Sequence, residues 1–350
     1  MIPPLPGLPI AAGHRDPDGR AEERPHIVSV VIPARNEAPR IERVVRAVLA
    51  QRRAGLELDL VVVDDGSTDG TSEVAHAAGA RVLRPDAQAP RGPRGGNPGA
   101  ARNRGAEAAR GDPIVFLDAD CEPGEGWLDS LLRAHETAAV VGGSLDLPDG
   151  LPLTARCGYY CDWYHTHPGR PAGRVPNHPP ANLSVRRQVL RDAGGFAEDM
   201  PVADGHEELG WQTAARAAGH TIRFEPRALA CHHNPPGIAN LLRRSYRWGY
   251  SSLEGKVQTG GARWGGLYRR PWLLIALSGP FAVAQAVYIV ACWVRVGRLE
   301  PLLLAPGIFA SRLAWATGMT VGGLRWLVRS RGPGALPEHA RGFAPRSSPP

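Results

Sequence analysis

Residues 26–37 read HIVSVVIPARNE, an apolar, β-branched run that reaches a proline and is followed by polar side chains. Such a run is typical of a strand whose two faces are both buried in a parallel sheet. The pattern returns at residues 58–65 (LDLVVVDD) and 114–120 (IVFLDAD), where apolar runs end at carboxylates. We therefore predict three strands that each end in a polar cluster.

Helical segments alternate with these runs. Residues 39–51 repeat apolar side chains on one helical face, whereas residues 67–78 begin with hydroxyl and acidic side chains and precede Gly79. A further short strand is predicted at residues 81–83. This alternation predicts an α/β fold with a doubly wound, mostly parallel sheet. Ligands bind such sheets at the carboxyl ends of the strands, where the polar clusters would meet.

The distribution of charge argues against a nucleic-acid partner. The 350-residue chain has a formal net charge of +7. Residues 1–150, however, carry 17 basic and 23 acidic side chains, and residues 236–350 carry 15 and 3. The part with the candidate site is thus acidic and would repel a phosphate backbone.

We expect five consecutive regions along the chain. They are a flexible leader (1–25), an α/β domain (26–235) with halves at 26–121 and 122–235, a basic amphipathic interfacial region (236–271), transmembrane or membrane-dipping helices (272–327) and a flexible tail (328–350). Within the α/β domain, residues 88–99 and 144–181 are expected to form mostly loops.

An apolar segment near the C-terminus predicts contact with a membrane. Residues 272–294 contain no charged side chain and are long enough to cross a bilayer as one helix. Seven basic residues lie between Arg243 and Arg270, with Glu254 as the only acid, which places that side in the cytoplasm. We therefore expect a membrane-associated protein with its α/β domain on the cytoplasmic side. A membrane-dipping hairpin is an alternative, because Arg295 follows the apolar run at once.

Two carboxylate pairs carry the candidate chemistry. Asp118 and Asp120 offer hard oxygen ligands that suit Mg²⁺ or Mn²⁺, and the bound ion could in turn hold a diphosphate. The alternative is that the two aspartates belong to a solvated turn. Asp64 and Asp65 suit the hydroxyls of a ribose or the N–H of a base, whereas helix capping is the alternative. The chain lacks the glycine-rich phosphate-binding sequences of dinucleotide oxidoreductases and P-loop nucleotidases.

Cysteines and histidines suggest one further metal site and one further ligand. Zinc is an alternative at Cys157, Cys161, His165 and His167, although this spacing matches no familiar zinc finger. His232 and His233 follow an extended segment, where a structural histidine and a metal ligand are the two alternatives.

The order of four motifs resembles the nucleotide-sugar-binding half of family 2 glycosyltransferases, which have the GT-A fold. These motifs are VSVVIPARNE, VVVDDGSTDGT, GAARNRGAEAARGD and IVFLDAD, and the later segments NHPPANLSVRRQVLRDAGGF and HEELGWQTAARAAGHTIRF are similar to that family's acceptor half. The resemblance covers about residues 27–250. Residues 244–248 (RSYRW) lack the glutamine of the Gln-x-x-Arg-Trp motif of processive synthases, which favours a single-transfer enzyme.

The resemblance implies roles for individual residues, and we expect the following assignments. Nucleobase and ribose contacts come from Pro33, Glu37, Asp64 and Asp65; diphosphate contacts come from Arg102, Asn103 and Asp118; the metal ligands are Asp118 and Asp120; and the catalytic carboxylates are Glu207 and Glu208. Glu208 occupies the position of the general base of inverting members, where the family usually has aspartate. Glu207 and Asp204 are alternatives for this role.

The expected function is metal-dependent transfer of a sugar from a nucleoside-diphosphate-sugar donor to a hydroxyl acceptor, with inversion. Mg²⁺ or Mn²⁺ is the expected cofactor, and cell-envelope glycan or glycolipid synthesis is the expected setting, with a lipid-linked acceptor as one option. A sugar-phosphate nucleotidyltransferase is the first alternative. The second is a non-catalytic, membrane-anchored nucleotide-sugar binder.

Overall fold

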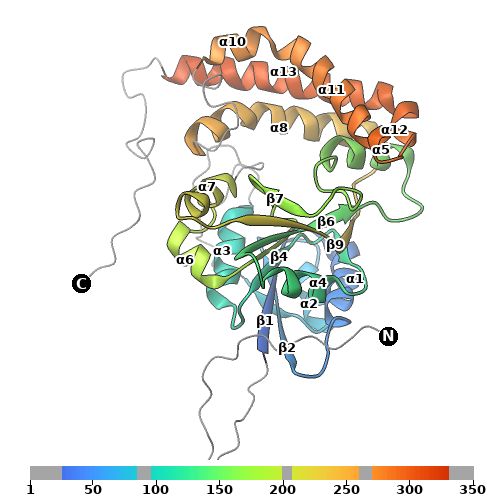
Figure 1. Ribbon diagram of the computed structural model, residues 1–350. Helices are drawn as coiled ribbons and strands as arrows, with labels where there is room; N and C mark the ends of the chain where they lie inside the picture. The colour runs from blue at the N-terminus through green and yellow to red at the C-terminus, as the bar shows by residue number, and fades with distance from the viewer. Residues whose placement is uncertain (1–25, 85–95, 199–206, 260–269, 331–350) are drawn as a thin grey trace, which may run out of the picture.

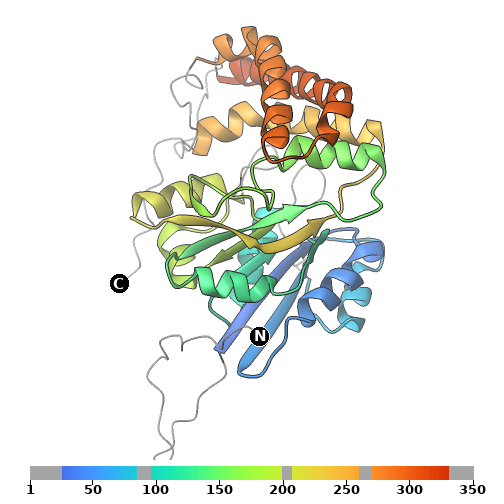
Figure 2. The same ribbon diagram turned by 45° about the vertical axis from the view of Figure 1, so that its right-hand side comes forward.

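The computed structural model of the chain describes residues 26–84, 96–198, 207–259 and 270–330 (Figure 1). One central sheet lies in the lower part of the molecule with helices against both faces, and further helices are stacked beyond one side of it (Figures 1 and 2). The sheet has nine strands in the order β3-β2-β1-β4-β8-β6-β9-β5, with β7 paired to β9.

The first four strands form a parallel half-sheet, as the sequence predicts. They are β1 (His26–Ala34), β2 (Leu56–Asp64), β3 (Arg81–Leu83) and β4 (Ile114–Leu117), and they alternate with α1 (Ala38–Leu49), α2 (Thr71–Ala77) and α3 (Pro98–Ala108). Ala34 pairs with Asp64, so β1 and β2 end at the same level. The polar residues that follow both strands are therefore neighbours.

Burial on both faces explains the continuous apolar runs. Val30 and Ile32 of β1 belong to a core on the face covered by α1, while Val31 points to a second core on the other face. A Cβ on Gly105 of α3 would lie 2.2 Å from the Val31 side chain, so α3 packs directly on the sheet through this glycine. Each fully buried β-branched side chain contributes about 1.5–3 kcal/mol.

The second half of the sheet is mixed, so the prediction of a mostly parallel sheet is wrong there. Its elements are β5 (Cys121–Pro123), α4 (Trp127–Ala134), β6 (Val140–Asp146), α5 (Leu153–Asp162), β7 (Gly173–Val175), β8 (Asn182–Val185), α6 (Arg187–Ala193), α7 (Leu209–Ala217) and β9 (Ile222–His232). Strand β8 runs antiparallel to both β4 and β6, and β5 and β7 run antiparallel to β9. An apolar run marks a buried strand but not its direction, which depends on distant partners.

Two segments expected to be loops contain regular structure. Residues 144–181 include α5 and β7, and α3 begins at Pro98 inside the glycine- and proline-rich stretch 88–99. Proline at a first helical position loses no hydrogen bond, which explains why this helix can begin there. Residues 85–95 lie outside the described residues, as do the leader at 1–25 and most of the tail.

The chain after β9 folds into helices. They are α8 (Ile238–Thr259), α10 (Pro271–Ala276), α11 (Ser278–Arg295), α12 (Glu300–Leu303) and α13 (Ala305–Ser330). Among the described residues, no helix combines the length and the apolar character that crossing a membrane requires. The segment 272–294, expected to be one spanning helix, instead forms two helices. It is divided at Leu277, because Pro280 has no N–H to donate to the carbonyl of Ala276 and its ring crowds that turn.

Glycines bring α8 and α13 into backbone contact. A Cβ on Gly318 would lie 1.9 Å from the carbonyl oxygen of Tyr246, and one on Gly322 would lie 2.2 Å from that of Tyr250. Gly249 of α8 approaches the carbonyl of Trp315 in the same way. Helix α8 therefore lies between the sheet domain and the outer helices, and is tightly attached to the latter (Figure 1).

Candidate active site

The site begins at the turn that follows β4. The backbone N–H of Cys121 donates to the carbonyl of Asp118 (2.9 Å), which closes a tight turn with Asp118 and Asp120 on it. The backbone N–H of Asp118 donates to the carbonyl of Ala181 (3.2 Å), which fixes the turn to the segment before β8. Both aspartate side chains remain partly exposed, so a ligand can reach them.

A buried arginine connects the first aspartate to the predicted catalytic carboxylates. Arg102 of α3 donates from Nη2 to Asp118 Oδ1 (2.7 Å) and from Nη1 to Glu207 Oε1 (2.6 Å). Burial lowers the pKa of Arg102, but the charges of Asp118, Glu207 and Glu208 outweigh burial and raise it. This permanent cation therefore orients both bound carboxylates, and a buried charge with two partners is costly to disrupt.

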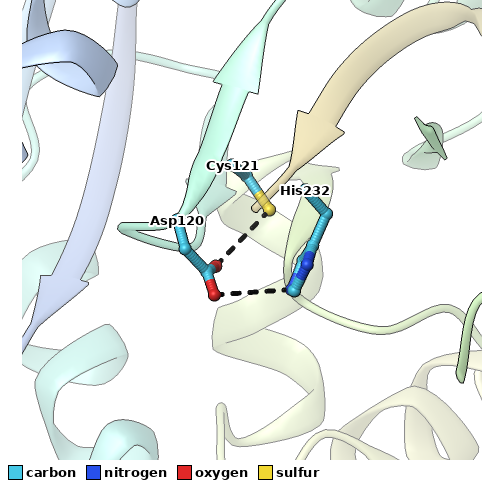
Figure 3. Close-up of side chains that lie close together, drawn as sticks. All are labelled: Asp120, Cys121 and His232. Atoms are coloured by element: carbon cyan, nitrogen blue, oxygen red, sulfur yellow. Dashed lines mark hydrogen bonds and ion pairs between the residues drawn. The ribbon is translucent and has the colours of Figure 1, made fainter. Parts of the chain in front are cut away.

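The second aspartate meets a histidine from the far end of the domain (Figure 3). Asp120 Oδ2 lies 3.5 Å from His232 Nε2, and Asp120 Oδ1 lies 3.9 Å from Cys121 Sγ. Cys121 and His232 are paired residues of β5 and β9, which is why residues so distant in sequence are adjacent. In the described part of the chain these three residues are the only group of His, Cys, Asp and Glu whose ligand atoms gather closely enough to hold a metal ion.

The imidazole of His232 is held from two sides. Its Nδ1 lies 2.7 Å from Asn234 Oδ1, and the ring of Trp163 packs against it with ring centres 4.8 Å apart. Because an amide oxygen can only accept, this contact assigns the proton to Nδ1. Nε2 then presents its lone pair toward Asp120, as a metal ligand must.

This donor set fits Mg²⁺ or Mn²⁺. A carboxylate of Asp120 and an imidazole nitrogen suit Mn²⁺, and Mg²⁺ takes the carboxylate together with phosphate and water oxygens. The thiol of Cys121 is a different case, because burial and the nearby charges of Asp120 and Asp118 raise its pKa well above the usual range. It therefore remains protonated and is a poor ligand for a hard cation.

The loops after β1 and β2 form the other end of the site. Asn36 has a positive φ of 55° and its side-chain oxygen accepts from the N–H of Thr68 (2.9 Å). The N–H of Glu37 donates to Thr71 Oγ1 (2.8 Å), while its carboxylate accepts from Arg40 Nε (2.6 Å). These bonds join the two loops, and Pro33 lies partly buried just before them at the end of β1.

The two adjacent aspartates after β2 have different environments. Asp64 is buried and accepts from the N–H of Ser67 (2.7 Å) and from the hydroxyl of Ser72, so it shapes the turn before α2. Asp65 accepts from the N–H of Asn97, and burial raises the pKa of its carboxyl. Neither aspartate caps α2, whose N-cap Gly70 has no side-chain cap hydrogen bond. Asp64 is committed to the turn, which leaves Asp65 as the carboxylate available to a ribose or base.

Asn103, one of the expected diphosphate contacts, is occupied by the protein itself. Its Nδ2 donates to the carbonyl of Phe196 (2.8 Å) and to Glu198 Oε1 (2.7 Å), and its Oδ1 accepts from the N–H of Phe196 (2.9 Å). These bonds attach α3 to the segment after α6. A contact between Asn103 and a diphosphate stays a prediction.

The candidate bases lie at the beginning of α7. Glu208 is the residue before the first turn and is nearly buried, beside the equally buried Glu207. Because Glu207 is bound by Arg102, its carboxylate is already committed to an ion pair. Asp204, the other alternative, lies outside the described residues.

The alternative zinc residues do not converge within the described part of the chain. Cys157 and Cys161 lie on α5, but His165 is exposed, whereas His167 is buried against Trp293 with ring centres 4.6 Å apart. Burial lowers the pKa of His167 to about 4, so this ring is a neutral packing group.

Sequence reasoning missed Asn234 and the contribution of Trp163. The signal for Asn234 was its position two residues after His232, the spacing at which a side chain beyond a strand can reach back. For Trp163 only the fold places the ring against the histidine.

Comparison with known proteins agrees with this geometry. Residues 29–192 match the family described as Glycosyl transferase family 2. The glycosyltransferase AglE of Haloferax volcanii is 28% identical over 303 residues, which cover 84% of this chain and 87% of that protein. The pre-mycofactocin glycosyltransferase of Mycobacterium tuberculosis is 29% identical over 340 residues, which cover 90% of this chain but 65% of that longer protein.

A solved structure shares the fold. The mannosyltransferase PcManGT from Pyrobaculum calidifontis, solved with GDP-Man and Mn²⁺, superimposes with a TM-score of 0.51 at 21% sequence identity. The match covers 86% of each chain. This likeness extends beyond the sheet and shows a shared fold.

Proposed function

We propose that this chain is a family 2 glycosyltransferase and that it transfers a sugar from a nucleotide-sugar donor to a hydroxyl acceptor with a divalent metal and with inversion. The match of residues 29–192 to that family and the likeness to AglE support the proposal. The observation that carries the proposal is the meeting of Asp120 and His232 beside the Asp118–Arg102–Glu207 ion-pair chain. A metal–diphosphate position and a candidate base are thus attached to one rigid set of residues.

The donor half would be bound by the joined loops after β1 and β2. Asp65 and Glu37 accept hydrogen bonds, which suits the hydroxyls of a ribose and the N–H groups of a base. Burial raises the pKa of both carboxyls, so each gains from a donor that satisfies its charge. Pro33 contributes an apolar contact beside them.

Asp120 and His232 would hold Mg²⁺ or Mn²⁺. The ion, when bound, supplies positive charge for the leaving diphosphate. Asp118 remains oriented by Arg102, which keeps two negative groups from repelling one another at the turn. The mannosyltransferase with the shared fold was solved with Mn²⁺, which supports this cofactor.

Glu208 would accept the proton of the acceptor hydroxyl as that oxygen attacks the anomeric carbon. Glu208 stands at the position that the resemblance assigns to the base, whereas Glu207 is bound by Arg102 (2.6 Å). Glutamate reaches one methylene farther than the usual aspartate, and the acceptor oxygen would lie correspondingly farther from the backbone of α7.

We also propose an acceptor that belongs to a cell-envelope glycan or glycolipid, with the catalytic domain on the cytoplasmic side of a membrane. Support comes from the basic, apolar helices that follow the catalytic domain. Through α5 they lie close to the site, because Trp163 at the end of α5 packs on His232.

A donor screen tests the reaction. Nucleotide-sugars are compared for thermal stabilisation of the protein with and without Mn²⁺, and the stabilising donor is then incubated with candidate alcohols, including lipid-linked ones. We expect metal-dependent stabilisation by one donor and transfer of its sugar with inverted anomeric configuration. Formation of a nucleotide-sugar and pyrophosphate from sugar phosphate would favour a nucleotidyltransferase instead, and saturable binding without turnover would favour a non-catalytic binder.

A further inference from the structure

Large apolar side chains are exposed almost exclusively on the C-terminal helices. Eighteen such side chains are exposed in the described residues, and all except Leu153 and Ile238 lie between Trp272 and Val328. The helices concerned form the layer farthest from the sheet (Figures 1 and 2). Contiguous apolar surface of this kind marks an interaction site rather than ordinary surface variation.

Helix α11 is apolar on both of its faces. Its buried stripe consists of Ser278, Ala282, Ala286, Ile289 and Trp293, which pack toward the rest of the protein. The opposite stripe includes Phe281, Val287 and Tyr288, which are 47%, 64% and 54% exposed. A helix that is apolar all round is expected to be covered on both sides.

Helix α13 has a matching outward stripe. Phe309, Leu313, Val321, Leu324 and Val328 are exposed and recur every three, four or eight residues, which places them along one helical face. The inward residues Ile308, Trp315 and Met319 are buried against the helices beneath. We call the two stripes, Phe281–Val287–Tyr288 of α11 and these five residues of α13, the outer apolar face.

Charge identifies the chemistry of the partner. Residues 270–330 contain six arginines and a single acid, Glu300. The carboxylate of Glu300 accepts from Arg156 Nη2 (2.6 Å) and from the hydroxyl of Tyr160 (2.7 Å), so its charge is already compensated. Arg270 and Arg295 are exposed at the ends of the α10–α11 segment. The outer apolar face is thus flanked by cations.

An anionic membrane fits this combination better than a second copy of the chain. If two copies of the chain paired through this face, their arginines would lie against one another and repel. If the face entered a bilayer, the flanking arginines would lie at the level of the acidic headgroups and attract them. Amphipathic helices that bind membranes lie in the plane of the interface with their apolar face at the acyl boundary and need not cross the bilayer. We propose that the outer apolar face binds in this way to a bilayer that contains anionic lipid.

The proposal explains two properties of the helices together. Residues 272–294 are divided at Leu277 between a helix of 6 residues and one of 18, and the outward side chains of both are apolar. The close packing of α13 on α8 through Gly318 and Gly322 attaches the outer helices to α8. The inference rests on the membrane setting proposed above, but vesicle binding is measured apart from sugar transfer, so either can fail without the other.

Vesicle binding of the whole chain tests the proposal. The protein is floated with vesicles of phosphatidylcholine alone or mixed with phosphatidylglycerol, at low and high salt. The test variant is Leu313→Glu with Leu324→Glu. Its matched control is Leu153→Glu with Ile238→Glu, which adds the same charge at the two large exposed apolar residues outside residues 272–328.

We expect the parent protein to bind the anionic vesicles, and this binding to weaken as salt is raised. The test variant should bind them about tenfold or more weakly, whereas the control variant should bind like the parent. Circular dichroism and donor-induced thermal stabilisation serve as checks that both variants fold. Absence of vesicle binding by the parent protein, or an equal loss in the control, would overturn the proposal. The proposal would also be overturned if light scattering showed a dimer of the parent protein, the test variant were monomeric, and vesicle binding were absent.

Discussion

Replacement of Asn234 by alanine tests how the protein prepares its histidine for a metal. Asn234 is 2% exposed, and its Oδ1 is the acceptor that holds the proton of His232 on Nδ1. Alanine removes that acceptor, leaves the N–H of a buried ring without a partner, and allows the proton to move to Nε2. Nε2 would then face Asp120 as a donor and could not bind a cation.

The expected effect follows from one buried hydrogen bond. Loss of a buried partner costs about 1–3 kcal/mol, and about 1.4 kcal/mol corresponds to a tenfold change in affinity. Removal of a group that orients a ligating histidine typically weakens metal binding about 10- to 100-fold. We therefore expect Asn234→Ala to weaken Mn²⁺ binding by about 10- to 100-fold, and Asn234→Asp, which keeps an acceptor, to retain most of it.

Calorimetric titration of Mn²⁺ in the presence of a nucleoside diphosphate measures this effect. Asn240→Ala is the matched control, because the Asn240 side chain donates locally to the carbonyl of Pro236 on the surface and is remote from the metal position. Urea denaturation separates weaker metal binding from general destabilisation. An affinity of Asn234→Ala within twofold of the parent, in a folded protein, would refute the reasoning.

Three further predictions concern the base, the pH dependence and the helix contact. Glu208→Gln should retain donor binding, measured by donor-induced thermal shifts, but should lower the steady-state rate of sugar transfer by about 100-fold or more. Equal transfer rates in variant and parent would remove Glu208 from the mechanism. Burial lowers the pKa of His135 to about 3, so the unfolded chain gains a proton near pH 6.5 that the folded chain does not. The free energy of unfolding should therefore fall by about 2 kcal/mol between pH 7 and pH 5 through this residue. Urea denaturation measures this loss, which His135→Gln should lack. Gly318→Ala should lower the free energy of unfolding by about 1–3 kcal/mol, because its Cβ would meet the carbonyl of Tyr246, whereas Gly279→Ala, with open space around it, should not.

The parallel half of the sheet was predictable because its signals are local. The apolar runs at residues 26–34, 56–64 and 114–117 become buried strands, and each ends at the polar residues that the sequence marks. Asp118 and Asp120 were predictable for the same reason. Their position depends only on the strand that precedes them.

The remainder depends on contacts that no local pattern contains. His232 reaches Asp120 because β5 and β9 pair antiparallel, and the pairing joins residues 111 positions apart, from Cys121 to His232. Arg102 meets Glu207 only when α3 packs beside α7. The direction of β8 is likewise set by β4 and β6 rather than by its own four residues.

One local signal was present and was outweighed. Pro280 interrupts the hydrogen bonding of a helix wherever it occurs, but the length of the uncharged run at residues 272–294 favoured a single spanning helix. The structure shows that the break prevails. The apolar character of the run then appears as exposed side chains on two helices rather than as one membrane span.

The central claim is that Asp120 and His232 hold a divalent cation for a nucleoside-diphosphate donor. The most direct measurement is Mn²⁺ binding, with the nucleoside diphosphate of the stabilising donor present, by the parent protein, by Asp120→Asn and by the control Glu122→Gln. Glu122 lies two residues away and pairs with His233 and Arg43 instead. We predict that Asp120→Asn loses Mn²⁺ binding and Glu122→Gln retains it; equal binding by Asp120→Asn and the parent would contradict the account.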